Sequence, residues 1–470
     1  MNGNGTIKIG KGLDIRVPGT AALQVAVADH ASYYAVTPSD CVGVSPRMLV
    51  AEGDSVKVGS PLFVDKNNEA ALFVSPVSGT VQRIVRGERR ALQAVVVASD
   101  GNLTALDNTP FDLSSATADS LAQWMSVHGL WTLLRQRPFG VVPALTDRPK
   151  ALFISAFDSS PLAVDYDFVL KESEEDFQKG LDALKLLAGK VHLSLHDRQR
   201  NSWLAHVKGA EVHFFDGPHP AGLVGTHIAC IDPINKGERV WTLEAQQVAV
   251  LGRSLRSGGY DPHRVVAVCG PSVVQPQYYR LLAGAPLSFI PQLLSQSADG
   301  KAVEHRCICG DILSGLSASM AVDSETSLPA GFLGAGVSKV CILPEGNYYD
   351  FMGWLRPNFR KYSFSHTFLS GFFNKCKSAA CHAKWQFDTG RHGDKRPLFV
   401  TGQFEKLTPL DIYPMQLIKA CVVGDIELME ELGIYEVEPE DLALCEFADT
   451  SKTEIQSIVR NALEKIRKEG

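Results

Sequence analysis

The stretch LVAEGDSVKVGSPLFVDKNNEAALFVSPVSGTVQRIV, residues 49–85, decides the fold of the N-terminal part of this chain. Three glycines, Gly53, Gly59 and Gly79, stand at intervals where tight turns require positive φ angles. The short alternating apolar runs between them are typical of strands with one buried face. We therefore expect a small β-rich unit over residues 1–105.

The pattern of this stretch resembles the biotinyl/lipoyl domains, which fold as a β sandwich. A carrier domain of that type presents a lysine flanked by methionine at its hairpin tip, because the cofactor arm is attached there through the lysine amine. The corresponding positions here are Asn67, Asn68 and Glu69, and the nearby Lys66 is displaced along the chain and lacks the flanking methionines. We expect the fold without a covalently attached cofactor.

The composition is that of a folded protein with several domains. The chain has 470 residues, more than one hydrophobic core usually serves, and 45% of them are hydrophobic and 21% charged. No stretch approaches the roughly 18 consecutive apolar residues of a membrane span. The N-terminal sequence MNGNGTIKIGKG has no apolar export region, so we expect a cytoplasmic location and mostly buried, reduced cysteines.

Strand and helix patterns alternate over residues 106–260, which predicts a Rossmann-like α/β domain with a mainly parallel sheet. KALFISAF, VHLSLH and EVHFFDG are expected strands. SEEDFQKGLDALKLLAGK is an expected helix with Ser173 and Asp176 at capping-box spacing. TLEAQQVAVLGRSLRSGG is an expected helix that begins at Thr242 and ends at Gly258.

Three further regions complete a multidomain α/β architecture. Short strands over residues 261–345 predict a small α+β unit of the ubiquitin-like or SLBB-like type, and residues 401–470 predict a helical C-terminal domain. Between them lies a basic aromatic connector, residues 346–400, with nine Lys/Arg and two Asp from Phe351 to Arg396. It either binds a partner subunit or membrane surface, or is a solvated linker over the acidic tail. No recognition motif accompanies the charge, which disfavours nucleic acid.

Motifs that would hold a cofactor or metal are missing from the sequence. No G-x-G-x-x-G joins a strand to a helix, there is no Walker loop, and no Ser/His/Asp set carries a nucleophile elbow. His213, His219 and His227 are close in sequence only, which fits a loop and helix entrance better than a ligand site. We predict no catalytic, cofactor-binding or metal-binding residues. Two groups are candidates for a metal site: Cys307 with Cys309, and Cys376 and Cys381 with His382. Neither has a second pair of ligands at the spacing of a zinc site.

One stretch, GLWTLLRQRPFGVVPAL, is typical of a binding surface. It places Trp131, Arg135, Arg137 and Phe139 within nine residues, counted from 131 to 139. Aromatic faces and guanidinium donors suit a flat ligand with two carbonyl oxygens. The alternative is that the same residues pack the end of an element onto the sheet.

The chain resembles the NqrA family, whose members are subunits of the bacterial sodium-translocating NADH:quinone reductase. Long irregular strings spread from residue 129 to 447 carry the resemblance, which covers essentially all 470 residues. The strings are GLWTLLRQRPFGVVP, EEDFQKGLDAL, GPHPAGLVGTHI, VWTLEAQQVAVLGR, TPLDIYP and EDLALCEF.

The resemblance implies a role within a membrane complex that oxidises NADH, reduces quinone and exports Na⁺. It implies a peripheral protein on the cytoplasmic face of the inner membrane that has no redox cofactor and assists quinone binding beside NqrB, the membrane subunit. NADH, flavins and iron centres are expected on other subunits. The four residues Trp131, Arg135, Arg137 and Phe139 are then the expected quinone contacts, and the sequence leaves ubiquinone and menaquinone equally open.

Two alternatives differ in class from this expectation. The first is a scaffold subunit of the same complex without a quinone site. The second is a free-standing flavoenzyme similar to the flavin subunit of respiratory complex I. Trp131 and Leu133 stand where such relatives have a glycine-rich flavin loop, and Cys445 is the one cysteine left of an iron–sulfur motif. Both departures disfavour the flavoenzyme.

Overall fold

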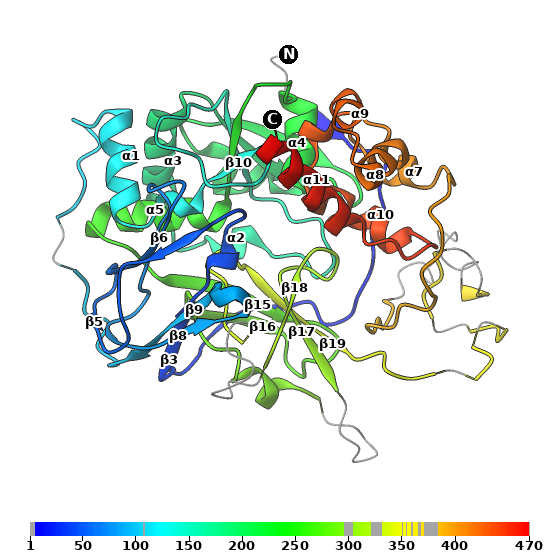
Figure 1. Ribbon diagram of the computed structural model, residues 1–470, viewed down its shortest axis with the longest axis horizontal. Helices are drawn as coiled ribbons and strands as arrows, with labels where there is room; N and C mark the ends of the chain where they lie inside the picture. The colour runs from blue at the N-terminus through cyan, green and yellow to red at the C-terminus, as the bar shows by residue number, and fades with distance from the viewer. Residues whose placement is uncertain are drawn as a thin grey trace.

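The computed structural model describes residues 5–106, 109–295, 304–320, 331–349, 351–353, 355–358, 361–364, 368–370 and 384–469. Within them the strands form two six-stranded sheets, one four-stranded sheet and one three-stranded sheet. Figure 1 shows the helical C-terminal region, in orange and red, beside the α/β region, with the sheet of β15 to β19 at the bottom of the view.

The N-terminal stretch forms two small antiparallel sheets. One has the order β3-β9-β8-β5 and the other the order β4-β6-β7. Buried side chains of both sheets belong to one core: Val81 and Val97 come from the first sheet, and Phe63 and Phe73 from the second, with 4.5 Å between the two ring centroids. The alternating apolar pattern therefore produced the expected strands. Their bounds are Tyr33–Val36 (β3), Pro46–Met48 (β4), Ser55–Val56 (β5), Pro61–Asp65 (β6), Leu72–Val74 (β7), Gly79–Arg86 (β8) and Leu92–Ser99 (β9).

The hairpin tip between β6 and β7 is bonded to the α/β region. The Asn68 side-chain amide donates to the carbonyl oxygens of Val142 and Pro143 at 3.1 and 3.0 Å. The Ser126 hydroxyl donates to the Ala70 carbonyl at 3.2 Å. The tip that a carrier domain would leave free is thus held in place by side chain to backbone hydrogen bonds.

The α/β region is built on a six-stranded sheet of order β1-β13-β12-β11-β14-β10. All neighbouring pairs are parallel except β10 with β14, so the predicted mainly parallel sheet is confirmed. The edge strand β1 comes from the start of the chain and pairs with β13. Bounds are Thr6–Lys8 (β1), Arg135–Arg137 (β10), Leu152–Ser155 (β11), Val191–His196 (β12), Glu211–Asp216 (β13) and Val240–Glu244 (β14).

Two helices of this region, α3 and α5, pack against each other through glycine. A Cβ at Gly180 would meet the Val248 carbonyl oxygen, and one at Gly252 would meet the Asp176 carbonyl oxygen, both far inside contact distance. The two backbones therefore approach only because both positions lack a side chain. Helix bounds are Ala118–Val127 (α1), Tyr166–Val169 (α2), Glu174–Ala188 (α3), Val224–Ile231 (α4) and Ala245–Ser257 (α5).

Two local predictions were wrong. The capping box of α3 does not form: Ser173 is the N-cap without a side-chain cap bond, because its hydroxyl accepts from Arg253 at 3.4 Å. The Asp176 carboxylate is instead paired with Arg256 at 3.1 Å. Helix α5 begins at Ala245, since Thr242 lies in strand β14, and it ends at Gly258 in the left-handed conformation as expected.

The third region is a mixed sheet of order β18-β17-β19-β15-β16-β2. Its edge strand β2 also comes from the start of the chain and runs parallel to β16. The N-terminal residues therefore complete two sheets outside the β sandwich. Bounds are Ala22–Val27 (β2), His263–Cys269 (β15), Gln277–Leu282 (β16), His305–Cys309 (β17), Leu316–Ala318 (β18) and Lys339–Pro344 (β19).

The described residues of the C-terminal region are helical, with a core that includes Leu417, Met429 and Val459. None of the helices in the described part of the chain is long and apolar enough to cross a membrane. Helix bounds are Phe404–Leu407 (α7), Pro414–Val423 (α8), Ile426–Glu431 (α9), Ala443–Ala448 (α10) and Ile455–Glu469 (α11).

The connector is described only in part. Tyr362 lies among the rings of Trp385, Phe387 and Phe447, at 6.1, 5.2 and 5.9 Å between centroids. These aromatic residues therefore join the connector to α10. The residues of the connector prediction that lie outside the described residues are Trp354, Phe359, Arg360, Phe372, Phe373, Lys375 and Lys377, and the same holds for Cys376, Cys381 and His382.

The docked hairpin tip gives a stability prediction. We expect Asn68→Ala to lower the free energy of unfolding by about 1–3 kcal/mol, because it leaves the Val142 carbonyl without its partner. The matched control is Asn67→Ala, since the Asn67 side chain is exposed at the same tip. Urea denaturation followed by tryptophan fluorescence measures both. Equal midpoints for the two variants would show that the tip is not held by this amide.

Candidate functional site

The predicted binding stretch forms a 3₁₀ turn followed by an edge strand. The turn η3 spans Trp131–Leu133, and β10 follows it and pairs antiparallel with β14. The chain then turns through Phe139 and Gly140, both at positive φ, 87° and 66°. The amide of Gln136 donates to the Val141 carbonyl at 2.7 Å and closes this turn.

Trp131 lies inside the core. Its side chain is fully buried, and its indole N–H donates to the Pro143 carbonyl at 2.8 Å. The ring meets Trp241 edge to face, with 5.4 Å between centroids and 84° between planes. Such edge-to-face packing stabilises both rings beyond their buried area. In this arrangement Trp131 joins the binding stretch to β14.

Arg135 lies where three regions of the chain meet. Its guanidinium donates to the carbonyl oxygen of Asp40 at 2.8 Å, to that of Leu134 at 3.0 Å and to that of Thr132. The Asp40 carboxylate accepts from the Thr37 hydroxyl at 2.8 Å and from the Ala335 amide at 3.1 Å. Burial raises the pKa of Asp40. These bonds link the β sandwich to both the α/β region and the third sheet.

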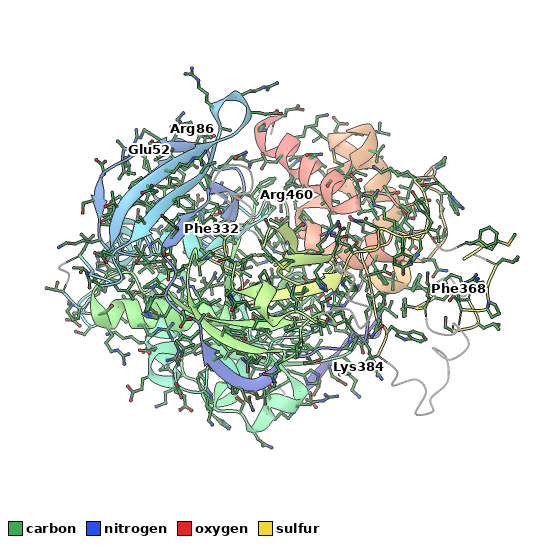
Figure 2. The ribbon with its side chains drawn as sticks, turned by 90° about the horizontal axis from the view of Figure 1, so that it is seen from below. Glu52, Arg86, Phe332, Phe368, Lys384 and Arg460 are labelled. Carbon is green, nitrogen blue, oxygen red and sulfur yellow. The ribbon has the colours of Figure 1, made fainter. Side chains whose placement is uncertain are left out.

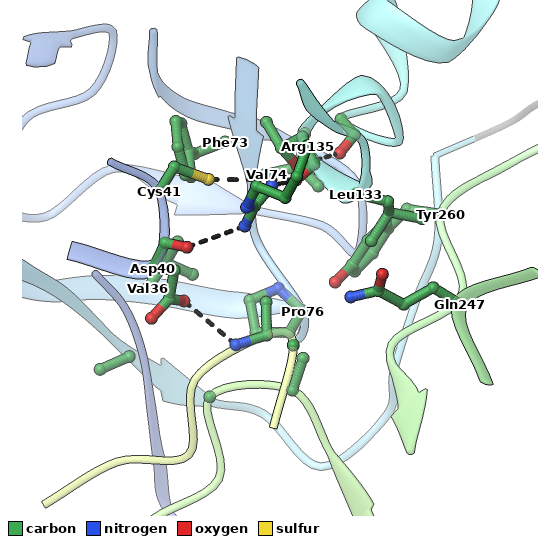
Figure 3. A pocket seen from close by; sticks show the side chains of 17 residues that line it. Val36, Asp40, Cys41, Phe73, Val74, Pro76, Leu133, Arg135, Gln247 and Tyr260 are labelled. Carbon is green, nitrogen blue, oxygen red and sulfur yellow. Dashed lines mark hydrogen bonds between the residues drawn. The ribbon is translucent and has the colours of Figure 1, made fainter. Parts of the chain in front are cut away.

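A cavity of about 40 Å³ lies at this junction (Figure 3). Pockets that hold small organic ligands usually measure roughly 300–1,000 Å³. The cavity is therefore suited to water and not to a quinone ring as it stands. It is lined by Ala35, Val36, Asp40, Cys41, Phe73, Val74, Pro76, Gly129, Thr132, Leu133, Arg135, Gln247, Tyr260, Ala283, Gly284, Ala335 and Gly336.

Arg137 and Phe139 face the C-terminal helices instead. The Arg137 guanidinium, 4% exposed, pairs with Asp441 at 2.8 Å and Glu440 at 2.6 Å. The Phe139 ring stands edge-on to Tyr435 with 6.1 Å between centroids. The Phe139 carbonyl accepts from Arg460 at 2.9 Å. The four predicted residues thus divide between the core, the three-region junction and the contact with the C-terminal helices.

A charge cluster forms around Arg137. Arg460 pairs with Glu438 at 2.7 Å, where the C-terminal helices meet the rest of the chain (Figure 2). The cluster has three carboxylates, on Glu438, Glu440 and Asp441, against two guanidinium groups, so full ionisation would leave one excess negative charge. Burial, reinforced by Glu440, raises the pKa of Glu438 to about 7, and burial also raises the pKa of Asp441. The cluster therefore holds a proton that an exposed carboxyl would have lost.

Sequence reasoning missed Asp40 and these acidic partners. The acidic run Glu438 to Asp441 is visible in the sequence, but nothing there indicates that Arg137, some 300 positions earlier, is its partner. The available sign was that an arginine in an element predicted to be buried needs a partner of opposite charge.

The histidines considered in the sequence lie in three places. His219 contacts the Ser159 hydroxyl at 3.1 Å, His227 is buried against the Ala221 carbonyl at 2.9 Å, and His213 lies 2.9 Å from His192. They do not form one cluster.

The described cysteines considered above are thiols in apolar surroundings. Burial raises the pKa of Cys307, and it raises those of Cys309 and Cys445 to about 12. The Cys445 sulfur lies 3.2 Å from the Thr408 hydroxyl.

Comparison with known proteins places the chain in a family. Residues 7–100 match the model described as the NqrA N-terminal barrel-sandwich hybrid domain, and residues 116–260 match the NqrA second alpha/beta domain. The chain is 37% identical over 467 residues to the NqrA protein of the Na(+)-translocating NADH-quinone reductase of Haemophilus influenzae strain 86-028NP, covering 99% of this chain and all of that protein. It belongs to the NqrA family.

Further NqrA relatives match over the same extent. The proteins of Pasteurella multocida strain Pm70 and Actinobacillus pleuropneumoniae serotype 5b are 37% and 38% identical over 469 residues, each covering 99% of this chain and all of the relative. The solved structure of NAD+-reducing [NiFe]-hydrogenase in the H2-reduced state has a TM-score of 0.36 and 14% identity over 77% of this chain and 68% of that one, which is too weak a likeness to bear on function.

The buried ion pair gives a prediction for this NqrA chain. We expect Arg137→Gln to lower the free energy of unfolding by about 3–5 kcal/mol, because it leaves the carboxylate of Asp441 buried without its partner. The control is Arg148→Gln, which removes an exposed surface pair with Asp119 and should cost under about 1 kcal/mol. Chemical denaturation of both purified variants measures the difference. A small, equal cost for both would contradict the buried pair.

The charge cluster gives a pH prediction. The pKa of Glu438 rises from 4.5 to about 7 on folding, so the folded chain keeps a proton that the unfolded chain releases in this window. This proton contributes its full stabilisation below the unfolded pKa of 4.5. The contribution is lost as pH rises through the folded pKa of about 7. Glu438→Gln mimics the protonated form, so its melting temperature should fall less than that of the wild type between these pH values. Thermal melts across the window measure it.

The control for this experiment is Glu427→Gln, at an exposed position on α9. Its melting curve should follow the wild type at every pH. If the melting temperatures of Glu438→Gln and the wild type changed equally with pH, another group would have to hold the excess proton.

Proposed function

We propose that the chain is a peripheral subunit of the Na⁺-translocating NADH-quinone reductase complex that assists quinone binding and complex assembly and has no redox cofactor of its own. The observation that carries this proposal is the 37% identity to an NqrA protein over 99% of the chain. The complex as a whole then oxidises NADH, reduces quinone and exports Na⁺, and this chain has no activity alone.

The absence of a redox cofactor is supported by two local features. Trp131 and Leu133 are buried side chains in the turn where a flavin-binding relative would need glycines. The buried thiol of Cys445 has a raised pKa, and a single thiolate does not hold a four-iron cluster. An absorbance spectrum of the purified chain with a stoichiometric flavin band would overturn this part.

We place the chain on the cytoplasmic face of the inner membrane, with the membrane subunit NqrB as its chief partner. Exposed apolar side chains in the described connector support a docking role: Tyr349 is fully exposed, and Phe351 and Leu355 are 78% and 63% exposed. Burial of such side chains against a partner would stabilise the complex. Figure 2 shows Phe368 of the described connector at the right-hand side of the molecule.

The quinone role rests chiefly on Arg135. Its guanidinium borders the cavity at the three-region junction, and a cation there would stabilise negative charge on a quinone that is being reduced. The cavity of about 40 Å³ would have to widen within the complex to admit a ring. All four residues have partners within the chain, Arg135 included, and this favours the second candidate, a scaffold subunit without a quinone site.

Arg135→Gln in the assembled complex separates the two candidates. If Arg135 contacts quinone, quinone reduction should fall about 10- to 150-fold, the equivalent of a charge-assisted hydrogen bond, while NADH oxidation with an artificial acceptor stays unchanged. Arg148→Gln, at an exposed position, is the control and should leave both rates unchanged. Ubiquinone and menaquinone analogues are assayed in parallel.

Unchanged quinone kinetics in Arg135→Gln would move the chain to the scaffold role. Loss of both rates together, with this chain missing from the purified complex, would indicate an assembly defect and would also count against direct quinone contact.

A further inference from the structure

We infer that His192, Glu211 and His213 form a zinc site on the face of the α/β sheet. In the described part of the chain they are the one group of three or more His, Cys, Asp or Glu side chains whose ligand atoms all lie within 4.8 Å of one another. The inference goes beyond the proposed function and does not depend on it.

The strand register brings the three side chains together. Strands β12 and β13 are parallel neighbours in which His192 is opposite Glu211 and Ser194 is opposite His213. Side chains two residues apart on a strand share a face, so Glu211 and His213 lie on the same side as His192. The site is thus built on two rigid strands instead of a loop.

The distances are those of a nearly formed coordination sphere. His192 Nδ1 lies 2.9 Å from His213 Nε2 and 3.5 Å from Glu211 Oε2. Tetrahedral zinc with bonds of about 2.0–2.1 Å holds neighbouring ligand atoms about 3.4 Å apart. A small outward movement of the His213 ring would therefore admit the ion between the three atoms.

The site is anchored on one side and open on the other. His192 is 1% exposed, and its ring stacks on Phe153 with 4.8 Å between centroids. The Glu211 side chain is 60% exposed, which gives an ion a path from solvent. The nearby lysines Lys150 and Lys190 are balanced by Asp232 and Glu238, with pair distances of 2.6 Å for Lys150–Asp232, 2.9 Å for Lys150–Glu238 and 3.8 Å for Lys190–Asp232. The carboxylate of Glu211 therefore remains to attract a cation.

The donor set selects the metal. Two imidazoles and one carboxylate with an open fourth position are the ligands of many zinc sites, and a water would complete the tetrahedron. Ferrous iron uses the same donors, but zinc binds nitrogen and oxygen ligands more tightly. His192 Nε2 has no hydrogen-bond partner among the described residues, so the Phe153 ring, and not a hydrogen-bond acceptor, orients this imidazole. We therefore expect a moderate affinity.

The test measures zinc binding by the full chain after treatment with a chelator. Titration of Zn²⁺ against a chromophoric chelator should show one equivalent bound, and bound zinc should raise the melting temperature. His213→Gln and Glu211→Ala should each weaken binding by roughly 10- to 100-fold or more. His263→Gln, at an exposed histidine beside Asp261, is the matched control and should bind as the wild type does.

Spectroscopy with Co²⁺ separates this site from the exposed thiol of Cys230. Cobalt on nitrogen and oxygen ligands gives visible d–d bands without a sulfur-to-metal charge-transfer band. Circular dichroism without metal checks that the variants fold, and Glu211→Ala is informative by itself because its side chain is exposed. The inference is overturned if binding persists in both ligand variants, if the cobalt spectrum shows thiolate, or if the wild type binds no zinc, which would leave a hydrogen-bonded histidine pair.

Discussion

The carbonyl oxygen of Pro143 accepts two hydrogen bonds, and the position of the β sandwich on the α/β region depends on it. One comes from the Asn68 amide at the hairpin tip, and the other comes from the buried indole of Trp131. A backbone carbonyl has two lone pairs, so this single atom satisfies donors from two regions of the chain. The hairpin tip, where a carrier domain would present its lysine, is therefore fixed to the α/β core. The position of the sandwich is therefore set by its neighbours.

The edge strand β10 also links regions of the chain, on one side to the β sandwich and on the other to the C-terminal helices. Arg135 reaches the Asp40 carbonyl in the β sandwich, and Arg137 reaches Asp441 in the C-terminal region. Between them, Gln136 accepts from the Trp241 indole at 3.2 Å and keeps the strand on its sheet. A strand of three residues thus joins three regions, because each side chain bonds to a different one.

The sequence predicted regular elements well and long-range partners poorly. Apolar alternation and the glycine at the end of α5 depend on residues close in the chain, so the sandwich strands, the parallel sheet and the C-cap at Gly258 were predictable. The capping box of α3 failed because Ser173 and Asp176 bond to arginines on α5. The aromatic and basic residues of the binding stretch could be identified, but their buried partners could not. The same limit hid His192 from the histidine cluster, since only the strand register brings it to His213.

The two N-terminal strands have a consequence for synthesis on the ribosome. Thr6 of β1 pairs with Phe214, 208 positions later (214 − 6), and Ala22 of β2 pairs with Gln277, 255 positions later (277 − 22). These strands are made before their partners, which emerge only after the sandwich and most of the α/β region have been made. Contacts between residues so far apart in sequence form slowly, because the entropy of closing a long loop is lost before the contacts contribute any stabilisation. Strands β1 and β2 are therefore made long before they can reach their native places, and until then two sheet edges stay open to chaperones and to neighbouring chains.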